Sequence, residues 1–342
     1  MKSVYIKNLF LDFIPAISGL IGKIALVSSF AFVWAQQLDI TYENFIFLNV
    51  RLELLIAAVI TLVAVLMFPK ASPPGTLAPL IVLVPFMVNY GVHPLILSIM
   101  VAVLGIIAVS TGLFKKLYLL SGHKSKSALG LVFGISGIIM SVETLFDFFN
   151  NLLPLGLILA ILSILYFVLT KYKKVWLIIL ISVFVSLPIA YLFGFEIDFS
   201  SQNNNIIINP SYWWNDIWNI GWGLDIKTIL VTLPFAFFVI VLWTIDTLSI
   251  NAIKEDFNKD FEMDLGSSFY VASFGNLTGG LLGGAQTSSI WRSFLIPLFM
   301  TKRPIRQSAF LLGAMCLVVA LWGYPIHALS FTPLIWSVLL FG

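Results

Sequence analysis

Long runs of apolar residues, separated by short polar or Pro/Gly-rich breaks, dominate the chain. A helix needs about 20 apolar residues to cross the hydrocarbon of a bilayer. About ten runs have this length: residues 12–35, 51–68, 93–114, 127–147, 152–170, 174–194, 226–250, 267–282, 306–322 and 324–341. The pattern therefore predicts an all-α polytopic membrane protein.

Two shorter apolar segments begin with residues that cannot start a lipid-facing helix. Residues 75–88 open with Pro73-Pro74-Gly75, and residues 286–300 follow a glycine-rich run over 279–284. Irregular backbone at membrane depth is tolerated only where it is buried in protein or lines a cavity. Counted as crossings, these segments are the third and tenth of about twelve. Because they are an odd number of crossings apart, they run in opposite directions, as an inverted repeat requires.

Basic residues fall in every second connection, and acidic residues prevail in the loops 36–49 and 195–225. Cytoplasmic loops are enriched in lysine and arginine. The basic connections hold Lys2, Lys7, Lys70, Lys115, Lys116, Lys124, Lys126, Lys171, Lys173, Lys174, Lys254, Lys259, Lys302, Arg303 and Arg306. The alternation is unbroken only if both broken segments cross. It predicts an integral protein of the inner or plasma membrane with both termini in the cytoplasm.

Composition excludes several classes of protein. Of the 342 residues, 60% are hydrophobic and 10% are charged, whereas soluble domains carry about 25% charged residues. The formal net charge of +3 is too small to indicate nucleic acid as a partner. One cysteine and three histidines leave little for a metal centre, so we expect no cofactor. We expect no enzyme either, because the Gly-x-Ser-Gly pattern at 134–137 is better explained by packing of small residues.

Tryptophans and acidic residues near the span ends are typical of the membrane interface. Trp213, Trp214, Trp218 and Trp222 predict a short interfacial helix. We interpret Asp12, Glu53, Glu143 and Asp147 as interface residues in the same way.

The two breaks carry the candidate substrate site. A helix start presents backbone N–H groups and the positive end of the helix dipole, which together favour an anion. Close packing of small residues explains the glycines but not the polar cluster that follows them. Arginine presents a fork of donors suited to an oxyanion. We expect substrate to contact Gly75, Thr76, Leu77, Ala78, Gln286, Thr287, Ser288, Ser289 and Arg292.

A second group of residues predicts ion coupling. Charged residues inside membrane spans are costly and usually functional, and Asp246 follows an apolar run with Thr247 and Ser249 beside it. A carboxylate facing an anion would repel it, so we expect Asp246 to take up a proton or to hold sodium with the neighbouring hydroxyls. The alternative is a purely structural ion pair between Asp246 and Arg292.

Four stretches resemble the SulP family of anion transporters. They are Asp246-Thr247-Leu248-Ser249, Gly275-Asn276-Leu277, the glycine-rich run 279–284, and Thr287 followed by Arg292-Ser293. The resemblance is strongest over 240–310. It implies the inverted-repeat fold that this family shares with the nucleobase-ascorbate and uracil permeases, with two half-helices and a core domain that slides against a gate domain.

On this layout residues 1–120 hold the first part of the core and residues 121–225 hold the gate with its Trp-rich loop. Residues 226–322 hold the second part of the core, and 323–342 a partial second gate. The family layout has two more crossings than this chain accommodates. We therefore expect a divergent, short relative or a homodimer that completes the gate.

These expectations converge on a secondary active transporter of a small inorganic or carboxylate anion, such as sulfate, bicarbonate or a dicarboxylate. It would work by an elevator-type movement coupled to protons or sodium. Two alternatives stay open. One is a nucleobase permease of the same fold, although such permeases usually carry a substrate-binding Glu near the position of Trp291. The other is a passive anion channel, which cannot accumulate its substrate.

Overall fold

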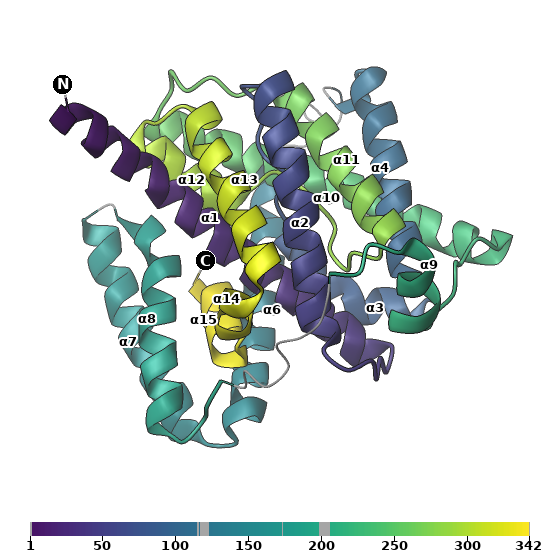
Figure 1. Ribbon diagram of the computed structural model, residues 1–342, viewed down its shortest axis with the longest axis horizontal. Coiled ribbons are helices and arrows are strands. Elements are labelled where there is room, and N and C mark those ends of the chain that lie inside the picture. Colours follow the sequence, from purple (N-terminus) through teal and green to yellow (C-terminus); the bar gives the residue numbers. More distant parts are fainter. Residues whose placement is uncertain (1, 115, 117–122, 173, 198–205, 342) are drawn as a thin grey trace.

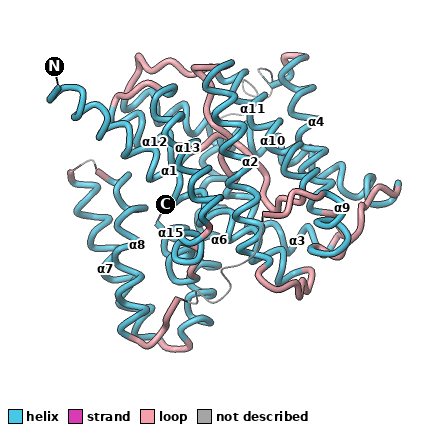
Figure 2. The backbone as a smooth tube through the Cα atoms, viewed as in Figure 1, coloured by secondary structure: helices cyan, strands magenta, loops and turns pink. Residues whose placement is uncertain are grey.

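The computed structural model describes residues 2–114, 116, 123–172, 174–197 and 206–341, and these residues contain helices but no named strand (Figures 1 and 2). The chain begins with α1 (Lys2–Gln37), α2 (Phe45–Met67), the 3-10 helix η1 (Ala78–Leu83), α3 (Val84–Asn89) and α4 (Pro94–Ser110). Then come α6 (His123–Phe149), α7 (Leu152–Lys171), η2 (Val175–Leu177), α8 (Ile178–Leu192), α9 (Pro210–Tyr212) and the π-helix η3 (Trp213–Ile217). The last elements are α10 (Ile226–Phe257), α11 (Leu265–Leu282), α12 (Arg292–Thr301), α13 (Ile305–Trp322), α14 (Tyr324–Leu329) and α15 (Thr332–Phe341).

Among the described residues, six helical segments are long and apolar enough to span a membrane. They are Leu11–Gln37, Phe45–Met67, Leu152–Lys171, Val175–Leu192, Ile226–Glu255 and Ile305–Trp322. Three shorter apolar helices cover Ala78–Asn89, Pro94–Ser110 and Arg292–Thr301. The chain is therefore an all-α protein embedded in a membrane. Of the basic residues used above to orient it, Lys115 and Lys173 lie outside the described residues, as do the side chains of Lys2, Lys7, Lys124 and Lys126.

Connections of like charge gather at two ends of the molecule. At one, here called the basic end, the loop after α2 meets the loop after α10, where Lys70 forms an ion pair with Glu262. The loop after α12 also lies there, and Lys302 and Arg303 line the same hollow as Lys70. At the far end, the loop after α1 meets α9 through the hydroxyls of Tyr42 and Tyr212, 2.8 Å apart.

Both broken segments pass from one end of the molecule to the other. α2 ends at the basic end and α4 begins at the far end, so residues 68–93 cross between them. α11 ends at the far end and α13 begins at the basic end, so residues 283–304 cross back. Helix η1–α3 forms the last part of the first passage and α12 the last part of the second (Figure 1). The two helices therefore point in opposite directions.

The helices form two groups. In the first group, α4 packs along α11 and α13 packs along α2, while α4 also contacts α10 and α13 contacts α1. This group comprises α1–α4 and α10–α13. The second group comprises α6, α7, α8 and α15, which pack on one another; α7 and α8 stand apart from the first group in Figure 1.

The last apolar run differs from the single span expected over 324–341. It consists of two short helices, α14 and α15, separated at Ser330 and Phe331. Pro333 explains the break, because it lacks the N–H that a continuous helix would bond to the carbonyl of Leu329, and because its ring would clash with that carbonyl.

The expected interfacial role is wrong for three of the four tryptophans. Trp213, Trp214 and Trp218 are at most 1% exposed. Their indole N–H groups donate to the carbonyls of Ile207, Leu281 and Gly283 at 2.8, 3.1 and 2.8 Å, respectively. Because the last carbonyls of a helix lack partners within the helix, the indoles of Trp214 and Trp218 complete the end of α11, whereas the indole of Trp213 binds the loop before α9. Only Trp222 is substantially exposed, and it stacks on Trp214.

Candidate functional site

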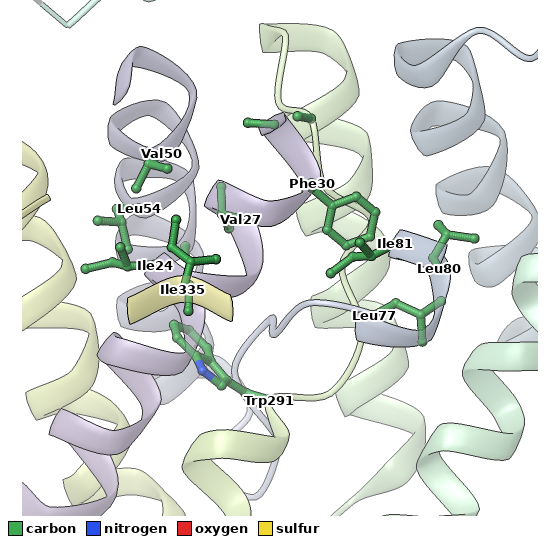
Figure 3. Packing of buried hydrophobic residues seen from close by; sticks show 14 of the residues in the cluster. Ile24, Val27, Phe30, Val50, Leu54, Leu77, Leu80, Ile81, Trp291 and Ile335 are labelled. Carbon is green, nitrogen blue, oxygen red and sulfur yellow. The ribbon is translucent and has the colours of Figure 1, made fainter. Parts of the chain in front are cut away.

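Two extended segments, residues 74–77 and residues 286–291, meet between helix η1–α3 and helix α12, which we call the half-helices. From here on, these two extended segments together are called the crossing. The backbone N–H of Gly75 donates to Ser289 O at 2.7 Å and that of Leu77 donates to Thr287 O at 2.9 Å. Gly75 is required because a Cβ there would lie 2.4 Å from the Cα of Trp291. Apolar side chains surround the pair, among them Phe30 of α1 beside Ile81 of η1 (Figure 3). The breaks seen in the sequence therefore form one antiparallel contact.

Several of the backbone N–H groups that were expected to face an anion donate to acceptors within the protein instead, among them those of Gly75 and Leu77. The N–H of Ala78 donates to Thr76 O at 3.0 Å, and Pro79 has no N–H. On the second segment, side chains accept the bonds: Asn49 from Ala285, Asn276 from Ser288 and Ser72 from Trp291. Buried backbone groups must find partners, and here the partners are internal. The crossing is thus mainly a scaffold.

Lys23 is a site residue that the sequence analysis missed. It lies in α1, is 1% exposed and reaches the crossing. Its Nζ donates to Gly75 O at 3.0 Å and to Gln286 Oε1 at 2.9 Å, so one ammonium holds both segments together. The ring of Trp291 lies 5.2 Å from the same Nζ. The signal was available, because Lys23 is a charge in the middle of the first apolar run.

Glu53 was expected at the membrane interface and is instead 1% exposed within α2. Its Oε2 accepts a hydrogen bond from Gln286 Nε2 at 2.6 Å. Gly284 makes room for it, since a Cβ there would lie 1.9 Å from Glu53 Oε1. Asp12, which was expected at the interface as well, is 5% exposed and forms an ion pair at 2.7 Å with Arg303 in the loop after α12, at the basic end of the molecule.

Asp246 and Arg292 face each other between α10 and the start of α12. Asp246 Oδ1 accepts from Arg292 Nη1 at 2.9 Å, and Ser289 Oγ donates to Asp246 Oδ2 at 3.4 Å. The carboxylate is buried, whereas the Arg292 side chain is 39% exposed. The guanidinium therefore neutralises Asp246 and keeps other donors accessible.

The expected partners of Asp246 in sodium binding point elsewhere. The hydroxyls of Thr247 and Ser249 donate to carbonyls of their own helix, those of Trp243 and Ile245. Among the described residues, no cluster of three or more His, Cys, Asp or Glu side chains is placed to hold a metal ion.

A cavity of about 940 Å³ lies between the two groups of helices. Its polar wall comes from the first group and consists of Lys23, Thr76, Asp246, Ser249, Arg292 and Ser293. Its opposite wall is largely apolar and includes Met140, Trp176 and Trp336. Phe257 and Met300, at the basic ends of α10 and α12, also line it, so the cavity extends toward the basic end.

Some of the expected site residues line the cavity and others do not. Thr76, Ala78 and Arg292 line it, as do Asp246 and Ser249. The others lie in or behind the polar wall: Gly75, Leu77, Gln286, Thr287, Ser288 and Ser289 belong to the crossing, and Thr247 is fully buried in α10.

Comparison with known proteins gives a family but no activity. No curated protein matches the chain. One family model matches it over residues 5–342, nearly its whole length. The chain therefore belongs to the family described as "Protein of unknown function (DUF3360)".

Proposed function

We propose that the protein is a secondary active transporter of a small inorganic or carboxylate anion. The observation that carries this proposal is the crossing itself. Two chain segments enter from opposite ends, pair in the middle of the first group and continue as half-helices that point apart. Discontinuous helices that meet in this way are how many transporters form a substrate site.

The packing of the first group supports an inverted repeat. The contacts of α4 with α11 and α10 become those of α13 with α2 and α1 when α1, α2 and α4 are exchanged for α10, α11 and α13. The same exchange relates the two broken segments. This is the pairing that a twelve-crossing relative of the SulP layout would have, with residues 1–120 and 226–322 forming the core.

The charges on the cavity wall favour an anion with a small polar head. Lys23 and Arg292 contribute two cations, and the N-terminus of α12 adds the positive end of a helix dipole. Thr76 and Ser293 add hydroxyls. Among the described residues, Asp246 is the one hydrogen-bond partner of the Arg292 guanidinium, which leaves further N–H groups for bidentate binding of an oxyanion.

Alternating access would follow from movement of the first group against the second. The cavity lies between them and extends toward the basic end. The enrichment of lysine and arginine in cytoplasmic loops supports a cytoplasmic position for this end. In this state substrate exchanges with the cytoplasm. Sliding the crossing past α6, α8 and α15 would bring the same wall to the far end.

Uptake by proteoliposomes tests the proposal. Radiolabelled sulfate, bicarbonate, succinate and uracil are offered separately, with and without proton and sodium gradients. We expect saturable, gradient-dependent accumulation of at least one anion. The matched control is Lys70→Ala, which removes an exposed cation that does not line the cavity and should transport normally. Uptake of uracil but of none of the anions would favour the nucleobase permease. An anion flux that does not saturate with concentration and leads to no accumulation would favour the channel.

A further inference from the structure

Two of the four charges at the site lack a direct ionic partner. Asp246 and Arg292 form a contact ion pair at 2.9 Å. Within the described residues, neither Lys23 nor Glu53 has an opposite charge within 4.0 Å. Instead Gln286 joins them, accepting from Lys23 at 2.9 Å and donating to Glu53 at 2.6 Å. A cation and a carboxylate are thus held apart by one neutral amide, deep in the molecule.

The neighbours of Glu53 offer it little other charge. From α1 only Lys23 faces it, and Cys316 of α13 also faces Lys23. Arg51, on the same helix, donates to the carbonyls of Ala320 and Leu321. α11 presents Gly279. At the far end, His327 of α14 stacks on Phe47.

We propose that Glu53 binds the coupling proton and thereby releases the charge of Lys23 for the transported anion. This inference rests on the proposed function and assigns the coupling site within it. With Glu53 ionised, the charges of Lys23, Arg292, Glu53 and Asp246 add up to zero. When Glu53 takes a proton from the aqueous phase and becomes a neutral acid, the sum is +1. An anion in the cavity then balances it, because an uncompensated charge in a medium of low dielectric constant is costly.

The geometry favours Glu53 over Asp246 as the group that changes charge. Asp246 receives a charge-assisted hydrogen bond from Arg292, which stabilises its ionised form. Glu53 receives its bond from a neutral amide. Its Oε1 is buried and has no hydrogen-bond partner among the described residues. Burying a charged carboxylate oxygen without a hydrogen-bond partner is costly. Protonation therefore lowers the free energy of the Glu53 site more than that of the Asp246 site.

The first experiment needs no substrate. Infrared spectra of the purified protein are recorded between pH 5.5 and 8.0, and the C=O band of a protonated carboxyl is followed. We expect a band that grows as the pH falls, is absent from Glu53→Gln and persists in the matched control Asp246→Asn. A titrating band that survives in Glu53→Gln would overturn the proposal.

The second experiment measures binding of radiolabelled sulfate and formate to the same proteins. Because coupling is reciprocal, the wild type should bind at least one probe about tenfold or more tightly at pH 5.5 than at pH 8.0. Glu53→Gln should bind tightly at both values, and Lys23→Met should bind poorly at both. Asp246→Asn should bind more tightly than the wild type at pH 8.0, because it also lacks one negative charge, and should still bind more tightly at pH 5.5, because Glu53 still titrates. Gln286→Leu keeps both charges and should keep the infrared band while reducing the pH dependence.

The outcomes separate this inference from the function on which it rests. Loss of pH dependence in Asp246→Asn but not in Glu53→Gln would overturn it, as would binding by the wild type that depends on sodium and not on pH. A wild type that binds and transports neither probe nor any anion of the uptake screen would contradict the proposed function. In that case the infrared measurement still decides whether Glu53 is the group that takes up the proton.

Discussion

Arg292 combines two tasks that are hard to separate by a single substitution. It is the direct partner of Asp246 and, at 39% exposure, the most accessible cation on the polar wall of the cavity. Replacing it removes donors for an anion and also leaves a buried carboxylate without its counter-charge. Leaving a buried charge unpaired is often costlier than the pair was favourable.

Two variants separate the role of Arg292 in anion binding from its role as the counter-charge of Asp246. We expect Arg292→Ala to weaken anion binding about 30-fold, or about 2 kcal/mol, as for loss of a charge-assisted hydrogen bond. In Arg292→Ala/Asp246→Asn the stranded carboxylate is gone, so the fold should recover while binding stays weak. Equilibrium binding and thermal unfolding of both proteins are the measurements. Full recovery of binding in the double variant would show that Arg292 only neutralises Asp246.

Gly75 tests whether the crossing depends on close backbone approach. A Cβ there would meet the backbone of Ile290 and Trp291, which cannot move aside as a flexible side chain can. We expect Gly75→Ala to destabilise the protein by about 2 kcal/mol or more, in the range of overpacked cores. Gly156→Ala is the control, since its Cβ would meet nothing within 4 Å and alanine favours a helix. Equal unfolding midpoints for the two variants would contradict this role of Gly75.

Single residues also show where sequence reasoning reaches its limit. That Asp246 and Arg292 lie together could be anticipated, since both are charges in apolar surroundings. Glu53 could not be placed, because its position near the start of an apolar run is also typical of an interface residue. Its burial depends on Gly279 of α11 and on Gly284 just after that helix, which lie more than 200 positions away in the chain and leave space for the carboxyl.

Among the elements, the two broken helices were the most predictable. Pro73 and Pro74 in the first break, and Gly283 with its positive φ in the second, interrupt helices for local reasons that any context preserves. Their pairing was not predictable, because hydrogen bonds between residues 74–77 and 286–291 depend on the whole first group being assembled. For the same reason the sequence could not show that several of the backbone N–H groups expected to bind an anion, such as those of Gly75 and Leu77, donate within the protein instead.

The start of α4 contains a titratable cap. His93 Nδ1 accepts from the backbone N–H of Ile96 at 3.3 Å, and Nε2 donates to Gly221 O at 3.1 Å, which is the pattern of a neutral imidazole. Burial lowers the pKa of His93 below its ordinary value of 6.5. Protonation would remove the acceptor that caps α4 and links it to the Trp-rich loop.

A pH dependence of stability follows for this element. The unfolded chain takes up a proton on His93 as the pH falls below 6.5, while the folded chain does not until lower pH, so acid favours unfolding. Apparent unfolding midpoints should therefore drop from pH 8.0 to pH 5.5. His93→Asn keeps a cap acceptor but cannot titrate, so its midpoint should vary less over this range. An equally steep pH dependence in His93→Asn would exclude His93 as the cause.

For the whole molecule, the alternation of charge along the sequence and the two ends of the structure agree. Lys70, Lys302 and Arg303 come together although the chain between them crosses repeatedly. Hydropathy could not predict the division of the helices into two groups, because α6 and α7 are as apolar as the helices of the first group. That division decides where the cavity lies and toward which end it extends.

Access to the cavity provides the test at this scale, and the chain is suited to it because its single cysteine, Cys316, is fully buried. Met300 lines the cavity near the basic end, and Glu43 lies exposed in the loop after α1 at the far end. A membrane-impermeant thiol reagent should label Met300→Cys in inside-out vesicles and Glu43→Cys in right-side-out vesicles, with little background from the wild type. A transported anion should slow labelling of Met300→Cys but not of Glu43→Cys, because only the former lines the cavity that the anion enters. Labelling of both variants from one side would contradict the arrangement of two opposite ends, and labelling of Met300→Cys from the outside alone would place the opening of the cavity on the other side of the membrane.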